Sequence, residues 1–435
     1  MRIALLHYHQ RPSGVNQVIS LQAKVLKALG HEVLIPDLPE LDYSTTPLLS
    51  GAELLQRLKD LVPKIDLWII HNPTLGKNAT FPDFIRELAQ KGVPIVLQCH
   101  DFAEDGRPTN YQGLSQTTHL YPLAPHIHYA VINSRDAGIL EKGGIPTSQI
   151  HFLPNAVTRE ALPPAPADSP FILYPVRGIR RKNLGELCLW AKHAPAGTRF
   201  AIASKPENPA WIACFEDWEN FTQQENLPVE FDVVSDEQPF DFWLKKSTHL
   251  ATTSIAEGFG LTFIEPHFLG RPLIGRDLPE ITRDFSAEGL TSANLYPEIA
   301  VPLEALDLTK LKDDFCTQIE ATFSTYGQSL DAASTWECFI ENGTVDFGNL
   351  PEIHQQELIR NHHFPDLKAW LAQALSESTV PTQNTEAWSS HRYQERIIKI
   401  LTEVCSASPA TPDFLPKENI LSQFLNPKRF HFLRT

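Results

Sequence analysis

Apolar and amphipathic stretches alternate from the first residues of the chain. Residues 2–8 contain a continuous apolar run, which is typical of a strand buried on both faces of a parallel sheet. Between residues 18 and 29, apolar side chains recur at the spacing of one helix face, and Gly30 marks the end of that helix. Residues 31–36 follow as a second predicted strand. The pattern therefore predicts a strand–helix–strand unit at the start of the chain.

The same alternation continues and then meets a proline-rich stretch at 163–170. Before that stretch it predicts a helix at 81–91 and strands at 67–71, 94–100 and 129–134. Together these elements describe a doubly wound parallel sheet. The prolines of 163–170 lack the N–H groups that a helix or a central strand needs. We therefore expect a domain boundary there, with an N-terminal Rossmann-like domain at 1–165.

A second series of elements follows this boundary. Its predicted strands are 171–176, 199–203, 229–234, 249–253 and 272–275, and its predicted helices are 183–193, 209–226 and 262–270. The series predicts a second Rossmann-like domain at 171–330.

Beyond residue 330 the pattern weakens. An amphipathic helix is predicted at 389–405 and a loop at 406–416, and the tail 426–434 is basic and aromatic. We expect 331–435 to be a helical extension that packs back on the N-terminal domain. Contact of the tail with a membrane surface is the less favoured alternative.

Composition and charge narrow the classes of function. A formal net charge of -15 at pH 7 makes nucleic acid and anionic membranes poor partners, since both would repel the average surface. The six cysteines include no Cys-x-x-Cys pair, so they favour a reducing compartment over a disulfide framework. The N-terminus lacks a signal-peptide pattern, and no stretch approaches the roughly 18 consecutive apolar residues of a membrane span. We expect a cytoplasmic protein.

A glycine-rich turn lies between two glutamates, Glu257 and Glu265. Gly258 and Gly260 fall between a predicted strand and a predicted helix, so backbone N–H groups can approach a ligand at the helix N-terminus. Such a turn predicts a phosphate site. The two carboxylates, about 12 Å apart at the rise of a helix, suit sugar hydroxyls because each accepts several hydrogen bonds.

A cluster of four cations follows the predicted strand 171–176. Positive charge at this strand-to-helix junction would neutralise a diphosphate leaving group. We assign that role to Arg177 and Lys182, and interpret Arg180 and Arg181 as surface charges.

The string from residue 257 to 274 resembles the Glu-x7-Glu signature of the family-four retaining glycosyltransferases. The resemblance implies the GT-B fold, an α/β fold in which two Rossmann-like domains face each other across a cleft. It implies that Glu265 holds the ribose of a nucleotide-sugar donor and Glu257 the hydroxyls of its sugar. Arg177 and Lys182, five residues apart, match the pair that this family places on the diphosphate. The implied donor site also contains Gly258, Phe259, Gly260 and Leu261.

Three further positions match the family less closely. Gly14, in the loop 11–17, is similar to the family's glycine-rich loop beside the donor phosphates, although a simple turn that needs one flexible residue explains it equally well. His100, after the predicted strand 94–99, resembles the family's histidine that reaches the donor sugar; a capping or surface histidine is the alternative. Val234 stands where the family's backbone holds the nucleobase.

These residues predict a reaction. The sequence lacks an Asp-x-Asp motif, and Arg177 and Lys182 with the amides of the turn could replace the charge of a metal ion. No histidines have the spacing of a metal site. We expect metal-independent and cofactor-independent transfer of a hexose from a UDP- or GDP-sugar to a hydroxyl of a small molecule or saccharide. The resemblance implies retention of the anomeric configuration.

Three alternatives differ from a transferase. A UDP-sugar epimerase or hydrolase of GT-B fold would release or invert sugar without an acceptor. A non-catalytic scaffold that binds partners through 331–435 would be expected to lose its cation pair or its glutamates, and all four are present. A nicotinamide enzyme would carry Gly-x-Gly-x-x-Gly after its first strand, and this chain does not.

Overall fold

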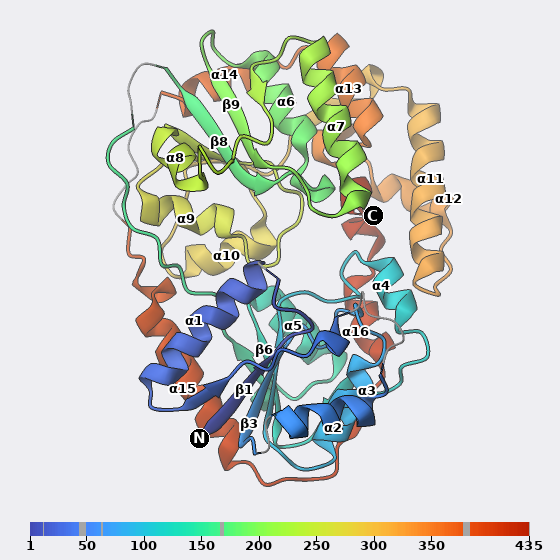
Figure 1. Cartoon of the computed structure of the whole chain (residues 1–435). Helices are drawn as coiled ribbons and strands as arrows, with labels where there is room; N and C mark the ends of the chain where they lie inside the picture. The colour runs from blue at the N-terminus through green and yellow to red at the C-terminus, as the bar shows by residue number, and fades with distance from the viewer. Residues whose placement is uncertain (12, 43–48, 62–63, 166–168, 377–382, 435) are drawn as a thin grey trace. The chain divides into compact units, whose positions relative to one another are not determined.

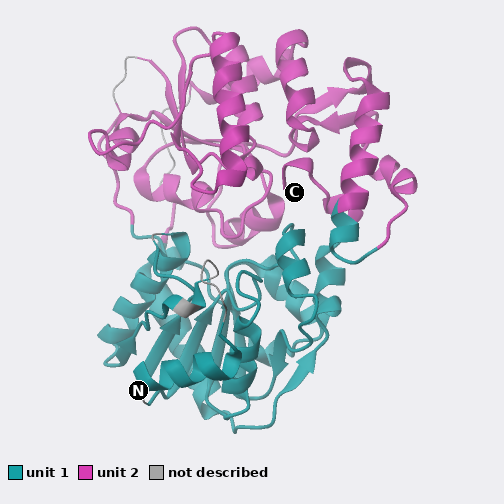
Figure 2. Ribbon diagram, turned by 45° about the vertical axis from the view of Figure 1, so that its right-hand side comes forward, with its two compact units in different colours: residues 1–158, 322–328, 386–426 teal, residues 159–321, 329–385, 427–435 magenta. Residues whose placement is uncertain are grey.

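The computed structural model describes the chain except residues 12, 43–48, 62–63, 166–168, 377–382 and 435 (Figure 1). It forms two compact units, each assembled from separated segments (Figure 2). Unit 1 comprises Met1–Thr158, Thr322–Gln328 and Glu386–Asn426. Unit 2 comprises Arg159–Ala321, Ser329–Thr385 and Pro427–Thr435.

Unit 1 is built on a six-stranded parallel sheet with the order β2-β1-β3-β4-β6-β7. Its central strands are buried along their whole length, as the unbroken apolar runs predict. The strands are β1 (Arg2–Leu6), β2 (Glu32–Leu34), β3 (Leu67–His71), β4 (Ile95–Cys99), β6 (Ile127–Val131) and β7 (Ile150–Phe152).

Helices cover both faces of this sheet. One face packs on α1 (Gly14–Ala28) and α15 (Ser390–Ser406), which lie side by side in Figure 1. The other face packs on a larger group of helices. These are α2 (Gly51–Leu61), α3 (Phe81–Ala89), α4 (Pro108–Gly113), α5 (Ser134–Gly143) and α16 (Lys417–Phe424).

A late segment of the chain completes unit 1. The strand β16 (Asp413–Leu415) pairs antiparallel with β5 (Tyr121–Leu123). The prediction of a loop throughout 406–416 is therefore wrong over its last part. Three residues are too few to show a period of two, and the partner strand lies far away in the sequence.

Unit 2 contains a second six-stranded parallel sheet, with the order β10-β9-β8-β11-β12-β13. This is the strand order of a Rossmann sheet, whose topological switch point lies between its first and fourth strands, here β8 and β11. The strands are β8 (Phe171–Arg177), β9 (Arg199–Ser204), β10 (Val229–Glu230), β11 (His249–Thr252), β12 (Leu273–Arg276) and β13 (Asn294–Tyr296).

The helices of unit 2 include two, α13 and α14, that pack beside α6. The strands β14 (Ala300–Pro302) and β15 (Thr344–Asp346) form a small antiparallel sheet in this unit. The helices are α6 (Leu184–His193), α7 (Pro209–Gln224), α8 (Phe240–Lys246), α9 (Leu261–Leu269), α10 (Pro279–Ala287), α11 (Leu308–Thr325), α12 (Ala332–Thr335), α13 (Glu352–Asn361) and α14 (Pro365–Ala374).

Two expectations for this part of the chain are wrong. The predicted strand 229–234 ends at Glu230, because Asp232 adopts a left-handed conformation with φ of 51°. The basic and aromatic tail, expected on the N-terminal domain, belongs to unit 2 from Pro427 onward. Phe430 and Phe432 are buried in unit 2, with ring centroids 5.5 and 6.4 Å from that of Phe315. The extension 331–435 is therefore shared between the units rather than forming one body.

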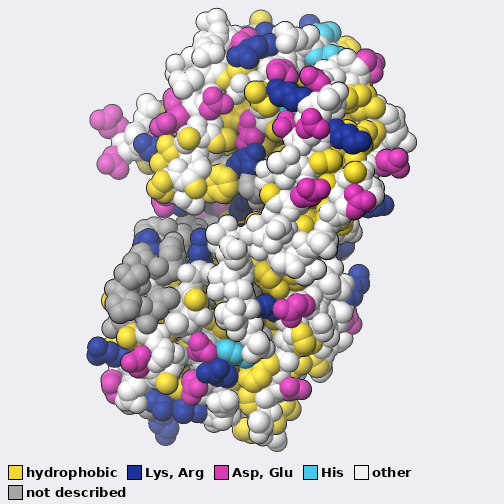
Figure 3. Space-filling model, turned by 90° about the vertical axis from the view of Figure 1, so that its right-hand side faces the viewer, with side chains coloured by type: hydrophobic (Ala, Val, Ile, Leu, Met, Phe, Trp, Pro, Cys, Tyr) yellow, Lys and Arg dark blue, Asp and Glu magenta, His cyan; other side chains and the backbone are white. Residues whose placement is uncertain are grey.

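Charges are mixed on the described surface. On the face of unit 2 drawn in Figure 3, Lys and Arg side chains are interspersed with Asp and Glu side chains. Among the described helices, none combines the length and the apolar composition that crossing a bilayer requires.

Candidate functional site

The loops after β8 and β11 meet at the switch point of unit 2. Neighbouring parallel strands bring the segments 178–183 and 253–260 to one edge of the sheet. The first segment turns tightly: Asn183 has φ of 50°, and a Cβ on Gly178 would lie 2.4 Å from the ring of Phe215. This close approach explains why glycine stands directly after the strand.

A buried ion pair joins these loops. The Nζ of Lys182 donates to Oε1 of Glu257, and the side chains are 11% and 8% exposed. Arg181 lies on the same carboxylate, with 3.6 Å between its guanidinium and Oε2. Burial raises the pKa of Glu257, but the cations Lys182 and Arg181 outweigh it and the net pKa is lowered. Burial lowers the pKa of Lys182, and Glu257 opposes that shift. Each partner therefore favours the charged form of the other.

Hydrogen bonds to the backbone fix the position of Lys182. The hydroxyl of Thr253 donates to the carbonyl of Lys182 at 2.9 Å, and that of Tyr174 donates to the same carbonyl at 3.1 Å. The guanidinium of Arg181 donates to the carbonyl of Ala256 at 3.0 Å. Because groups from both loops hold this segment, its cations have defined places before any ligand binds.

The glycine turn leads directly into α9. Gly260 has φ of 83°, and a Cβ there would lie 2.8 Å from the ring of Phe263, so the position requires glycine. In the first turn of α9 the amide of Phe263 donates to the carbonyl of Gly260 at 2.9 Å, and the N-terminus of the helix favours an anion. Phe259, predicted to bind the donor, buries its ring 5.7 Å from that of Phe285, so only its backbone is a candidate contact. Leu261 is partly exposed, at 36%.

Glu265 lies on α9 and has a partner that the sequence analysis missed. Its Oε1 accepts a hydrogen bond of 3.1 Å from Nε of Arg159, and its side chain is 19% exposed. Arg159 also lies 3.7 Å from a carboxylate oxygen of Asp241. Arg159 and Glu265 are far apart in the sequence, so no local pattern could have connected them.

The other cations of the cluster have separate partners. Arg177 pairs with Glu207 at 2.8 Å, and both side chains are about half exposed or more. Arg180 makes a bidentate pair with Glu352, with hydrogen bonds of 2.5 and 2.8 Å. The interpretation of Arg180 and Arg181 as surface charges is therefore wrong, since both are bound to carboxylates and partly buried.

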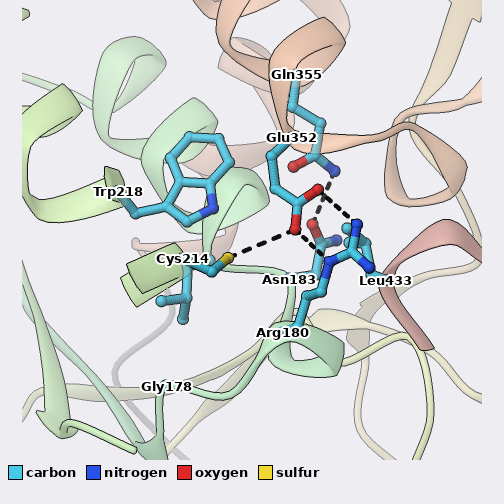
Figure 4. A pocket seen from close by; sticks show the side chains of 9 residues that line it. Gly178, Arg180, Asn183, Cys214, Trp218, Glu352, Gln355 and Leu433 are labelled. Carbon is cyan, nitrogen blue, oxygen red and sulfur yellow. Dashed lines mark hydrogen bonds and ion pairs between the residues drawn. The ribbon is translucent and has the colours of Figure 1, made fainter. Parts of the chain in front are cut away.

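Arg180 also lines a crevice that is too tight to admit water, shown in Figure 4. The thiol of Cys214 donates to Glu352 there, and the amide of Gln355 donates to Asn183. These contacts join the cation loop to α7 and α13. Their role is to hold the loop that carries Lys182.

Val234, predicted at the base pocket, follows β10 and is partly buried. Its amide donates to the carbonyl of Ala203 at 3.0 Å, so the backbone here continues the edge of β9 beyond the end of the paired strands. This places Val234 at the carboxyl end of the sheet, where the loops of a Rossmann fold contact ligands.

Unit 1 carries a chain of polar side chains at the carboxyl ends of β3 and β4. Because an amide oxygen only accepts, Nε2 of His71 donates to Oε1 of Gln22 at 3.1 Å. Nδ1 of His71 then accepts from Nε2 of His100 at 2.9 Å. The Nδ1 of His100 is thereby left as an acceptor. Gln22 in turn donates to Gln98 at 2.9 Å.

These histidines are held neutral. Burial lowers the pKa of His100 to about 4, with Asp101 opposing the shift. Burial also lowers the pKa of His7, which lies after β1, to about 4. The capping alternative for His100 is not what the structure contains, since its ring belongs to a buried network.

Gly14 is the first residue of α1, and Ser13 caps the helix by accepting from the amide of Asn16 at 3.2 Å. A Cβ on Gly14 would meet nothing within 4 Å. Pro12, in the same predicted loop, lies outside the described residues. The geometry of Gly14 therefore does not require glycine for packing.

The polar groups of unit 2 and those of unit 1 suit different kinds of ligand. In unit 2, two cations and a row of helix amides lie around a glycine turn, which suits a diphosphate. In unit 1, neutral imidazoles offer directional hydrogen bonds, which suit hydroxyl groups.

No family model matches the chain. The mannosylglucosyl-3-phosphoglycerate synthase of Petrotoga mobilis is 25% identical, and the alignment covers 97% of each chain. A sucrose-phosphate synthase of Thermosynechococcus elongatus has a similar structure, with a TM-score of 0.53 and 15% identity over 93% of this chain and 96% of that one.

HepE of Anabaena, solved in complex with UDP and glucose, has a TM-score of 0.52 and 13% identity over 92% of this chain and 99% of its own. At such identities the structures establish the fold alone. Together with the relative that matches over nearly its full length, they identify this chain as a glycosyltransferase of the GT-B fold.

Proposed function

We propose that the chain transfers a hexose from a UDP- or GDP-sugar to a hydroxyl of a small-molecule or saccharide acceptor, with retention and without a metal ion. The observation that carries the proposal is the buried Lys182–Glu257 pair beside the glycine turn. A buried cation costs desolvation free energy unless another charge pairs with it. The departing diphosphate develops negative charge, which a cation held in this position would stabilise.

In this proposal Lys182 and Arg177 bind the diphosphate together with the amides of Gly258 and Gly260. Glu257 keeps Lys182 in position and then shares its hydrogen bonds between that cation and the donor sugar. Arg181, which already contacts the same carboxylate, compensates its charge when Lys182 turns toward phosphate. The positive charge that a metal ion supplies in other transferases comes from these side chains.

Glu265 is proposed to bind the ribose diol, with Arg159 orienting its carboxylate. Val234 is proposed to hold the nucleobase through its backbone. His100 and Gly14 are proposed to contact the transferred sugar and the donor phosphates, as the resemblance implies. The neutral state of His100 supports a hydrogen-bonding role rather than that of an ion.

The acceptor is proposed from the chemistry of the relative. The product named for the Petrotoga mobilis protein contains a glucosyl unit and a phosphoglycerate unit. Phosphorylated sugar acceptors are therefore the first to test, followed by neutral saccharides.

The test begins with a screen of UDP, GDP and ADP by thermal shift, and then of their sugars. The best donor is titrated by calorimetry into the wild type, Lys182→Ala and Glu265→Ala. We expect binding to be weakened by roughly tenfold or more in each variant, since each loses a charge-assisted hydrogen bond. Donor binding that is unchanged in both would overturn the assignment.

Two further readouts address the finer parts of the proposal. Proton NMR of the first product formed reports the anomeric configuration, and inversion would contradict retention. Activity after treatment with EDTA reports metal dependence, and its loss would contradict catalysis by side-chain cations alone. Incubation of the donor without acceptor separates a transferase from a hydrolase or an epimerase.

A further inference from the structure

Two buried histidines and a glutamate converge in unit 1, away from the candidate site. His128 lies on β6, His151 on β7 and Glu403 on α15. The register pairs Ala130 with His151, so His128 and His151 project from the same face of the sheet, the face that α15 covers. One candidate ligand atom from each of the three residues lies within 4.8 Å of the other two.

The hydrogen bonds assign the protons of both rings. Nε2 of His128 lies 3.1 Å from the carbonyl of Pro125, which can only accept, so this nitrogen carries the hydrogen. Nδ1 of His128 is therefore an acceptor, and it receives a hydrogen bond of 2.7 Å from Nε2 of His151. The remaining nitrogen, Nδ1 of His151, is left with a lone pair.

That lone pair faces a carboxylate. Nδ1 of His151 lies 3.8 Å from Oε2 of Glu403, so two acceptors point at one another with no hydrogen between them. The hydrogen bonds of the neutral rings supply no hydrogen for this contact. A cation placed between the two acceptors would be bound by both.

We propose that this cluster binds a divalent transition-metal ion of the Zn²⁺ type. An ion about 2.1 Å from each ligand atom spans the distance between Nδ1 of His151 and the carboxylate of Glu403. His128 then acts as the positioning residue: it accepts from the opposite nitrogen of His151, which fixes the ring and raises its basicity. Imidazole and carboxylate ligands suit Zn²⁺ and disfavour Mg²⁺. Water completes the coordination, since Glu403 is 39% exposed.

The position of the cluster indicates a structural role. His128 is the second residue of β6, so it lies at the amino end of its strand, whereas His100 follows the carboxyl end of β4. The two sites are at opposite edges of one sheet. The ion would join the edge strand β7 to the last turn of α15, a helix that comes from a distant part of the chain. We therefore expect it to affect the stability of unit 1 and not the transfer reaction.

The same helix offers matched controls. Glu395 on α15 pairs with Arg392 at 2.5 Å, much as Glu403 has Lys399 within 3.9 Å, but no histidine of the cluster contacts it. His391, also on α15, is 70% exposed and lies 3.5 Å from Glu386. Glu403→Gln is a conservative change at a half-exposed helix position, so it should leave the fold intact.

The experiment titrates ZnCl₂ into the full chain after removal of metals with EDTA and dialysis. We expect one site in the wild type and in the controls Glu395→Gln and His391→Asn. Glu403→Gln and His151→Asn should weaken binding at least about tenfold, and His128→Asn by about 10- to 100-fold through loss of orientation. Zn²⁺ should also raise the Tm of the wild type, but not that of Glu403→Gln.

Equal Zn²⁺ affinity in the wild type and Glu403→Gln would overturn the proposal, because binding would then come from other histidines. Absence of a 1:1 site in the wild type would overturn it as well. A rise in Tm with MgCl₂ equal to that with ZnCl₂ would contradict the ligand chemistry. Each result is independent of donor binding, so it leaves the proposed function to its own test.

Discussion

Both units place polar side chains at the carboxyl ends of a parallel sheet, but these side chains are in different charge states. In unit 1, His7, His71 and His100 are buried, no carboxylate of the described residues forms an ion pair with them, and burial lowers the pKa of each. In unit 2, Lys182 and Glu257 are buried together, and each supports the charged form of the other. Strand order alone therefore does not determine which ligand suits the carboxyl end of a sheet. We expect the charge state of the buried side chains there to determine it.

The largest expected effect comes from breaking the charged pair of unit 2. Lys182→Met should lower transfer activity by a factor on the order of 10² to 10³, because the leaving diphosphate loses a preorganised cation. It should also lower the free energy of unfolding, but by less than the roughly 3–5 kcal/mol of a buried charge with no partner, since Arg181 still lies 3.6 Å from Glu257. Activity assays and urea unfolding measure the two losses.

The double variant Lys182→Met/Glu257→Gln separates structure from chemistry. With residues 182 and 257 both uncharged, it should recover most of the free energy of unfolding but none of the activity. Recovery of activity as well would mean that Lys182 acts only by holding the loop together.

The pH dependence of stability should distinguish the two groups. The folded pKa of His100, about 4, is below its ordinary value of 6.5, so the unfolded state binds more protons between these values. Stability should therefore fall as the pH drops from 6.5 to 4, by about 3 kcal/mol for such a shift. The difference in unfolding free energy between the wild type and His100→Asn should change across this window.

Glu257 should change stability in the same direction as His100 but in a lower pH window. Its folded pKa lies below the ordinary value of 4.5, so its contribution is present above pH 4.5 and is lost only as the pH falls further. The difference between the wild type and Glu257→Gln should thus be flat from pH 7 to 5. A change in that difference near pH 6 would contradict a charged pair.

Replacing one glycine in each unit by alanine should change the free energy of unfolding by a smaller amount. Gly260→Ala should cost about 1–3 kcal/mol, because the left-handed conformation and the ring of Phe263 both oppose a Cβ. Gly14→Ala should be neutral, or stabilising by about 0.4–1 kcal/mol, since it starts a helix with open space around it. Chemical denaturation of the two variants tests the comparison, and equal effects would refute it.

The smallest effect on stability is expected at Arg177. Its pair with Glu207 is exposed, so Arg177→Ala should change the free energy of unfolding by no more than about 1 kcal/mol. Binding of the donor diphosphate should nevertheless weaken. A variant with normal binding would remove Arg177 from the proposed site and leave Lys182 as its main cation.

The sequence predicts the sheets of both units well and the partners of their side chains poorly. The buried strands are apolar runs that only a parallel sheet explains, so β3 is predicted to the residue and β8 within one residue. The glycine turn could be predicted from the sequence because its left-handed conformation favours glycine over other residue types. By contrast, Glu352 and Arg159 contact the site from far along the chain, and a single sequence carries no periodic signal for such pairs.

The histidine network shows the same limit. His71 and His100 lie at the ends of predicted strands, but the sequence does not indicate that Gln22 fixes the tautomer of His71. The cluster of His128, His151 and Glu403 has no metal-binding spacing, because its residues come from two strands and a late helix. Both depend on contacts that exist only after folding.

The central claim is that unit 2 holds the donor diphosphate through its buried cation. Calorimetric titration of UDP and of GDP into the wild type, Lys182→Met and His100→Asn tests it most directly, with circular dichroism to confirm that each variant is folded. We expect one nucleotide to bind the wild type and His100→Asn with similar affinity, and to bind folded Lys182→Met at least about tenfold more weakly. Equal binding to the wild type and Lys182→Met, or a loss confined to His100→Asn, would contradict the claim.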